Sequence, residues 1–445
     1  RCQAPDDRLG VVWTAAHPQS RLISLRPVFQ QIFRQGPSDV SYLREELVDN
    51  LRQVERSDWD RISERCGLYL SYPFLLSVEE SSATPCSYLL LGDSAGALVA
   101  GLPMYSWDGS PDPSLDHYEP FAAGARWVLG RRARPEPWLP TLLVGTRSGY
   151  STEFAVSPAW EHYREAAVGQ LLRGAARQAE VLGAASLGVM WLTSAAAREA
   201  CGCLDRPEYL LLAGPNCAIE VEWDSFEGYL GQLSWSRRRS ARRELSRFRQ
   251  SGLQVQFSDL RSSLEEIAPL AARLQRKYGH AMRPEEIVEQ LQPQARHLNS
   301  ESRVILCRRR GRLVGFSLLF SWGGSLYGRL AGFDYKATSG TDAYFNLAFY
   351  LPLQMALDEG SRQLRLGMAT WKAKTLRGAR LDPAWTIACP PPSVRGAWSR
   401  VTRARGDGPS QWWSEQFPRQ AHWETDWRWT RSGLAGNAPA TIRPQ

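Results

Sequence analysis

The stretch that decides the fold is residues 344–380, YFNLAFYLPLQMALDEGSRQLRLGMATWKAKTLRGAR. It predicts a helix that stops at Gly360, a short strand at 363–366 and then a basic loop. The loop holds Lys372 and Lys374, although the whole chain has four lysines against fifty arginines. Because open α/β sheets collect ligand contacts where their strands end, we expect this loop to form part of a binding site.

The length and composition favour a folded protein of more than one domain. The chain has 445 residues, 18 tryptophans and a formal net charge of +8 that comes from arginine. Disordered chains are poor in aromatic residues, so packed structure should extend through most of the length. Guanidinium groups bind phosphate in a planar, bidentate way, which favours a nucleic acid or nucleotide partner. A genome-wide preference for arginine over lysine is the alternative explanation.

The cysteines and apolar runs exclude several classes of protein. The eight cysteines show no CxxC pair and no Cys/His cluster with zinc spacing, so we expect no metal site. Without a recognisable secretory signal, the scattered cysteines favour buried thiols in a reducing cytoplasm, and we expect a cytoplasmic protein. No apolar run reaches the roughly 18 to 20 residues that a membrane span requires.

Two segments of the chain repeat each other. GALVAGLPMYSW at 96–107 matches GRLVGFSLLFSW at 311–322 in five of twelve positions. Each segment completes a predicted β-hairpin that is followed by a long helix, a glycine and a short strand. In the second copy that helix should span 342–359, and in the first copy it should span 160–182. The repeated order indicates an internal duplication.

The duplication predicts a division of the chain near residue 215. We expect a first domain at 1–215, a second at 216–390 and a mostly irregular tail rich in Arg, Trp, Pro and Gly at 391–445. The second domain should begin with a strand at 217–223 and an arginine-rich helical region at about 224–250, with a serine or aspartate as the helix N-cap.

The helix SWSRRRSARRELSRFR at 234–249 contains seven arginines and one glutamate. Such a surface can follow a phosphate backbone and release counterions, which makes binding salt-dependent. The residues we expect to contact RNA are Arg237, Arg238, Arg239, Arg242 and Arg243. A solvated face of a structural helix is the alternative, but such faces usually mix charges of both signs.

The helix ending in EG, the LG strand end and the K…RG loop, together with the arginine-rich helix, resemble the Fem-type branch of the GNAT acyltransferase superfamily, the FemAB-like proteins. The resemblance covers roughly residues 87–390. It implies an α/β fold of two tandem GNAT-like domains, each with a mixed central sheet and flanking helices. It also implies transfer of an aminoacyl group from aminoacyl-tRNA to an amine, without coenzyme A and with no other cofactor.

The sequence departs from two patterns that could have been expected. The loop Q/R-x-x-G-x-G/A, which holds the pyrophosphate of acetyl-CoA at a helix start, is missing from GFDYKATSGTDAYFN at 332–346 and from GTRSGYS at 145–151. The region 245–304 is also too short, and too broken by prolines, for the coiled-coil arm of some peptidoglycan enzymes.

Amide formation from an ester needs a neutral amine, a route for its proton and donors for the oxyanion. Asp334 and Tyr344 could orient or deprotonate the amine, and Lys336 could stabilise negative charge. Lys372, Lys374 and Arg377 should bind an anionic part of the substrate. Capping and packing are the alternative roles for Asp334 and Tyr344.

We therefore predict an N-acyltransferase that moves an aminoacyl group from aminoacyl-tRNA to the amine of a peptidoglycan precursor or a peptide-like metabolite. An acyl-CoA-dependent N-acyltransferase of the same fold is the second possibility. A non-catalytic RNA-binding protein built on a degenerate acyltransferase core is the third.

Overall fold

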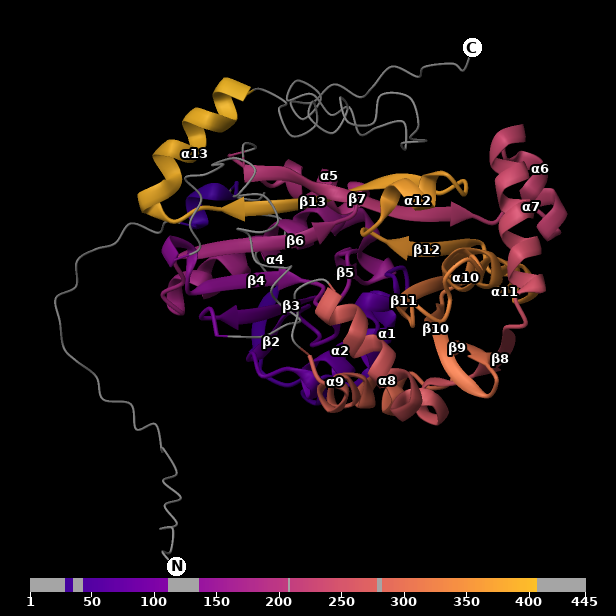
Figure 1. Ribbon diagram of the computed structural model, residues 1–445. Coiled ribbons are helices and arrows are strands. Elements are labelled where there is room, and N and C mark those ends of the chain that lie inside the picture. The colour runs from indigo at the N-terminus through magenta and orange to yellow at the C-terminus, as the bar shows by residue number, and fades with distance from the viewer. Residues whose placement is uncertain (1–28, 35–42, 111–135, 207–208, 278–281, 406–445) are drawn as a thin grey trace, which may run out of the picture.

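The computed structural model describes residues 29–34, 43–110, 136–206, 209–277 and 282–405. A single 13-stranded mixed sheet runs through the molecule, with helices on both of its faces (Figure 1). The strands are β1 (Arg44–Val48), β2 (Cys86–Gly92), β3 (Leu98–Trp107), β4 (Thr141–Gly145), β5 (Ala155–Val156), β6 (Ser186–Leu192), β7 (Leu210–Glu220), β8 (Gln254–Ser258), β9 (Ser302–Arg309), β10 (Arg312–Trp322), β11 (Ser325–Phe333), β12 (Gln363–Gly367) and β13 (Arg380–Cys389).

Helices connect these strands in a repeated order. The α-helices are α1 (Arg56–Ser63), α2 (Tyr72–Ser81), α4 (Arg164–Val181), α5 (Ser194–Gly202), α6 (Phe226–Gln232), α7 (Trp235–Gln250), α8 (Leu260–Lys277), α9 (Pro284–His297), α10 (Ala343–Phe345), α11 (Leu351–Asp358), α12 (Trp371–Thr375) and α13 (Pro392–Arg405). A π-helical turn, η10 (Asn346–Tyr350), joins α10 to α11. Short 3₁₀ turns are η1 (Gln30–Ile32), η3 (Leu51–Gln53), η4 (Leu68–Leu70), η7 (Glu136–Trp138) and η8 (Pro158–Tyr163).

The strand order is symmetric about the centre of the sheet. It reads β1-β2-β3-β4-β6-β13 and then β7-β12-β11-β10-β9-β8. Each half has one parallel pair, β4 with β6 and β11 with β12, and every other pairing is antiparallel. The two halves therefore repeat one topology, which confirms the predicted duplication and the α/β fold of two tandem GNAT-like units.

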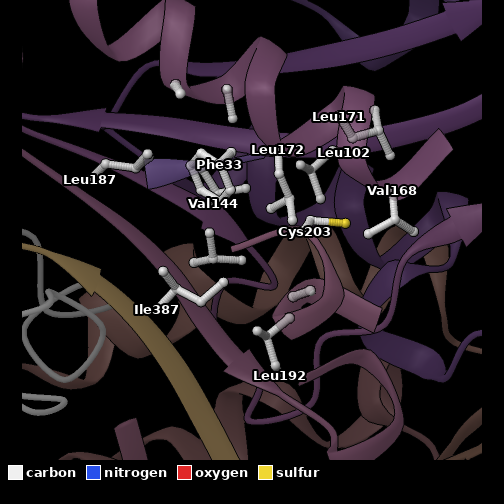
Figure 2. Close-up of a cluster of buried hydrophobic side chains, with 14 of the residues drawn as sticks. Phe33, Leu102, Val144, Val168, Leu171, Leu172, Leu187, Leu192, Cys203 and Ile387 are labelled. Atoms are coloured by element: carbon white, nitrogen blue, oxygen red, sulfur yellow. The ribbon is translucent and has the colours of Figure 1, made fainter. Parts of the chain in front are cut away.

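The last strand of each half lies against the other half. β13 pairs with β6 of the first half, and β7 pairs with β12 of the second. Figure 2 shows the consequence in the first core, where Ile387 of β13 lies among Val144, Leu187 and Leu192. The predicted division at residue 215 falls inside β7, and the assignment of 1–215 and 216–390 to separate units stays a prediction.

Alternation along the strands gives the sheet two buried faces. In β9, Val304 and Leu306 pack with α8 and α9, whereas Ile305 and Cys307 pack with the helical region that contains Leu347 and Leu353. We call these the α8 face and the α11 face. Helices α2, α8 and α9 lie together on the α8 face (Figure 1). In the region 245–304, α8 packs directly on β9, β10 and β11, and α9 packs on α8.

The predicted helix at 342–359 is interrupted. Pro352 has no N–H to donate to the carbonyl one turn earlier, and the π-helical turn η10 ends just before it. The predicted stop is confirmed, because Gly360 has φ +65° and Ser361 N–H bonds to the Ala356 carbonyl at 2.8 Å. The predicted serine N-cap is also present, since Ser225 Oγ accepts from Gly228 N–H at 3.1 Å.

The prediction of an irregular tail is wrong for residues 392–405, which form α13. Pro392 stands at the first helical position, where its missing N–H costs nothing. Trp398 is fully buried, and its ring centroid lies 5.5 Å from that of Trp138. The remainder, 406–445, lies outside the described residues.

We expect Trp398→Ala to lower the free energy of unfolding by about 3–5 kcal/mol, because it leaves a cavity between α13 and the first half. Urea denaturation would measure this loss. Trp235→Ala is the matched control, since Trp235 is 71% exposed on α7 and its removal should change stability by less than about 0.5 kcal/mol. Equal effects of the two substitutions would contradict the packing of α13.

Candidate active site

The parallel strand pairs of the two halves differ at their carboxyl ends. In the first half, β4 and β6 pair over five residues, and Thr152 then bridges to Leu192. In the second half, β11 and β12 pair over three residues and part after Tyr327 and Arg365. Ligand contacts in open sheets gather where neighbouring strands separate. This parting, the β11–β12 seam, is therefore the candidate active site.

Tyr344 lies at the carboxyl end of the seam. Its hydroxyl is 3.3 Å from Thr370 Oγ1, which joins the start of α10 to the loop that follows β12. The Tyr344 ring packs edge-on against Phe333 at the end of β11. Thr370 has φ +54°, a conformation that side chains other than glycine adopt rarely. The structure thus brings the predicted Tyr344 together with the segment before Lys372.

The predicted basic loop is a short helix, α12, and its two lysines point to different environments. Residues two apart on a helix do not share a face. Lys372 is exposed, with Nζ 5.3 Å from the centre of the Trp371 ring. Lys374 is buried and donates from Nζ to the carbonyls of Leu366 at 2.6 Å and Gly367 at 2.8 Å. Burial lowers the pKa of Lys374 to about 8. Lys374 thus holds the end of β12, and substrate binding by it stays a prediction.

Arg377 is also buried, and its partner is the one glutamate of α7. Its Nη2 donates to both carboxylate oxygens of Glu244 at 2.8 Å. Tyr350 donates to the same carboxylate, and Tyr229 donates to the Arg377 carbonyl at 2.9 Å. The guanidinium carbon lies 3.6 Å from the centre of the Phe345 ring. This Glu244–Arg377 pair fixes α7 against the end of the seam.

Asp334 and Lys336 lie in the turn after β11. Asp334 accepts from the Ala337 N–H at 3.0 Å and pairs with Arg312 at 2.6 Å and Arg273 at 3.4 Å. The Ala337 hydrogen bond is the largest cause of its lowered pKa, which the two arginines lower further. A carboxylate held ionised in this way is a weak base. Lys336 is exposed on the same turn.

The five arginines predicted to bind RNA differ in their protein contacts. Arg237 donates to the Thr375 carbonyl at 3.3 Å, and Arg238 donates to the carbonyls of Gly231 and Leu233. Arg242 pairs with Glu227 at 3.0 Å. Arg239 stacks on Trp235, and Arg243 is exposed. Arg239 and Arg243 form no ion pair with any described carboxylate, which leaves their charges available to a partner.

Several polar residues at the seam were not predicted. Tyr327, Arg329 and Arg365 come from β11 and β12, whereas Tyr69 and Tyr150 come from the first half. A signal existed in the strand QLRLG, where an arginine stands between the buried Leu364 and the half-buried Leu366. The two tyrosines of the first half had no signal, because their place beside the seam depends on how the halves meet.

The described residues contain no group of three or more His, Cys, Asp or Glu side chains arranged to hold a metal ion. The seven cysteines in this part of the chain are free thiols, and burial raises the pKa of Cys203 to about 12. Within the same described ranges, no helix combines the length and the hydrophobicity needed to cross a membrane.

Sheet topology and the parting of β11 from β12 define a tandem GNAT-fold protein. Residues 50–388 match the FemAB-like family, described as acting in peptidoglycan biosynthesis/recognition. Because the match covers more than half of its length, the chain belongs to the FemAB-like family of GNAT-fold N-acyltransferases. No curated protein matches the chain significantly.

Solved structures with a similar overall arrangement share little sequence with this chain. The C-terminal domain of a lysylphosphatidylglycerol synthetase from Agrobacterium fabrum is 12% identical with a TM-score of 0.46, over 78% of this chain and 96% of that one. FemX is 11% identical with a TM-score of 0.46, over 77% and 93%. A tandem GNAT protein from clavulanic acid biosynthesis is 12% identical with a TM-score of 0.42, over 78% and 99%. Likenesses this distant carry no inference about substrate.

We expect Glu244→Gln to destabilise the fold by about 3–5 kcal/mol, because it leaves the buried Arg377 without its counter-charge. Urea denaturation of the wild type and the variant would measure the difference. Glu227→Gln breaks the exposed pair with Arg242 and should cost less than about 1 kcal/mol. A small effect of Glu244→Gln would show that this contact does not hold α7 in place.

Lys374 predicts a particular pH dependence of stability. An unfolded lysine titrates near pH 10.5, so between about pH 8 and 10.5 the unfolded chain binds a proton that the folded protein lacks. Stability therefore rises with pH in this window. Relative to Lys374→Met, the free energy of unfolding of the wild type should increase by about 3 kcal/mol across it, and not below it. If the free energies of unfolding of the two proteins changed with pH in the same way, Lys374 would not have a lowered pKa in the folded protein.

Proposed function

We propose that this protein transfers an aminoacyl group from aminoacyl-tRNA to the amine of a peptidoglycan precursor or a peptide-like metabolite. Membership of the FemAB-like family supports an acyl transfer that forms an amide. One observation favours tRNA as the donor: the arginine-rich helix α7 contacts α12, which follows β12, and η10, which follows the turn after β11.

The position of α7 supports this choice of donor. Arg237 Nη1 reaches the carbonyl of Thr375 on α12, and the Glu244–Arg377 pair joins the same two segments farther along α7. The only acidic side chain of α7 is thereby buried, and its outer surface carries arginines. A phosphate backbone bound along α7 would bring the end of a tRNA close to Tyr344 and Lys372.

The reaction joins two atoms and separates two others. The acceptor nitrogen attacks the carbonyl carbon of the aminoacyl ester and forms a C–N bond. The C–O bond to the ribose then breaks, and the ribose oxygen takes a proton as it leaves. The nitrogen must lose a proton, and the carbonyl oxygen carries negative charge in the tetrahedral intermediate.

We assign roles to the predicted residues on their positions. Tyr344 can relay a proton at the end of the seam, and the exposed Lys372 can bind an anionic part of a substrate. Lys336 can stabilise negative charge at the turn after β11. Asp334 is a weaker choice for the base, because the Ala337 N–H and the two arginine partners lower the pKa of its carboxyl group and so make the carboxylate a poor proton acceptor.

One feature weighs against an acyl-CoA donor. In a CoA-dependent GNAT enzyme the pyrophosphate would lie at the start of the helix after β11. Here Asp342 stands at that start, with its carboxylate 3.5 Å from Arg247. This ion pair leaves no excess positive side-chain charge at the start of the helix to attract a pyrophosphate.

Replacement of Arg239 and Arg243 with Gln tests the proposal. Binding of aminoacyl-tRNA should weaken, and the dependence of log K on log salt should become shallower by up to about 2, because two phosphate contacts are lost. The matched control replaces Arg276 and Arg283 with Gln, since both lie away from α7 on the α8 face. The measurement is a binding titration at several salt concentrations.

This titration, together with an assay of transfer from labelled aminoacyl-tRNA to an amine, separates the alternatives. Release of deacylated tRNA with a labelled amide on an amine acceptor supports aminoacyl transfer. Binding of acyl-CoA without tRNA binding would assign the protein to CoA-dependent transfer. Equal affinity for charged and uncharged tRNA with no ester consumed would assign it to RNA binding alone.

A further inference from the structure

A cluster of tyrosines and arginines lies on the α8 face of the seam, opposite to α7. Leu364 and Leu366 pack on the α11 face with Leu353, so Arg365 between them points to the other side. There its guanidinium carbon lies 5.3 Å from the centre of the Tyr327 ring. Donor and acceptor can thus approach the seam from opposite faces of the sheet.

Arg329 of β11 is on the same side as Arg365. Its Nε is 3.4 Å from Gln294 Oε1 on α9, a helix of the α8 face. Tyr69 lies edge-on to Tyr327 with ring centres 5.6 Å apart. Burial raises the pKa of Tyr69 to about 12, and Arg329 and Arg365 both oppose this rise. Both guanidinium groups therefore lie close enough to Tyr69 for their charges to act on its hydroxyl.

Neither arginine lies within ion-pair distance of a carboxylate in the described parts of the chain. Arg329 and Arg365 form no ion pair there, and Arg365 Nε is buried without a hydrogen-bond partner. Glu153 is the acidic side chain that acts on Tyr327, and it accepts from Ser151 Oγ at 3.0 Å instead of pairing with an arginine. Two half-buried guanidinium groups without an ion-pair partner leave positive charge on this face of the seam, which a bound anion would neutralise.

The first half closes the cluster from the side. Tyr150 is held by Asn216, whose Nδ2 donates to its carbonyl at 3.1 Å. The Tyr150 ring stands 3.9 Å from the position that a Cβ on Gly367 would occupy. Gly367 follows Arg365 by two residues, about 7 Å along a strand. The cluster therefore lies about 7 Å along β12 from the loop whose Thr370 contacts Tyr344.

We propose that Arg329 and Arg365 bind an oxyanion, a carboxylate or a phosphate, of the acyl acceptor on the α8 face of the seam. This inference rests on the proposed function and specifies its acceptor, an amine that also carries an anionic group. Two guanidinium groups supply paired N–H donors to the oxygen atoms of such an anion.

Calorimetric titration in the absence of tRNA tests this site, with two probes that separate the sources of the oxyanion. One is inorganic pyrophosphate, and the other is N-acetylglycylglycine beside its neutral carboxamide. We expect the wild type to bind one of the two anions and not the carboxamide. Arg329→Gln and Arg365→Gln should each weaken that binding at least about tenfold, the loss of a charge-assisted hydrogen bond.

Arg362→Gln is the matched control, because Arg362 is exposed immediately before β12 and should leave the affinity unchanged. Arg365→Lys keeps the charge and should fold with partial affinity if Arg365→Gln does not fold. Unchanged affinity in both Gln variants, or no binding of either anion by the wild type, would overturn the proposal. The double variant Arg239→Gln, Arg243→Gln should bind the anionic probe with unchanged affinity. If transfer from tRNA were not observed, the probe titration would still test the anion site on its own.

Discussion

The antiparallel pairing of β7 with β13 is the constraint on which the rest of the structure depends. These two strands lie at the centre of the sheet, and each carries its half of the chain into contact with the other half. Their exchange makes one continuous sheet from two repeated units and places residues 67–70 and 150–153 of the first half beside the second-half seam. The site therefore contains residues from both halves of the chain, although only the second half has a parallel strand pair, β11 and β12, that separates early.

The arginine excess serves two different purposes around that seam. Arg377 is buried and neutralised by Glu244, so it positions α7 and takes no part in the surface charge. Arg239 and Arg243 extend from the opposite side of the same helix and remain available. One ion pair therefore fixes the orientation of the whole cationic surface relative to the seam. On the other face of the sheet, Arg329 and Arg365 form no ion pair with a carboxylate of the described residues.

Short stretches of sequence predicted many of the helices, turns and hairpins, but they did not predict which residues far apart in the chain are in contact. The glycine after 342–359, the repeated hairpins and the arginine helix are properties of short windows, and the structure contains all of them. The partner of Glu244 is 133 residues away, and no periodicity relates the two. The sequence predicted a loop, in which Lys372 and Lys374 would have similar environments. In the structure they lie on a helix, so one side chain is exposed and the other is buried. Arg365 was recognisable as a charge within an apolar strand, while Tyr69 and Tyr150 required the contact between halves.

The exchanged strands also impose an order on biosynthesis. During translation β6 is made long before β13. The core around Leu192 is therefore incomplete until Ile387 has been made (Figure 2). Until then, the edge of β6 that will pair with β13 has unpaired backbone N–H and C=O groups, which can pair with another strand and promote aggregation. The first half therefore lacks one strand of its sheet and part of its core until β13 is made, and a chain that stopped before β13 would leave both copies incomplete.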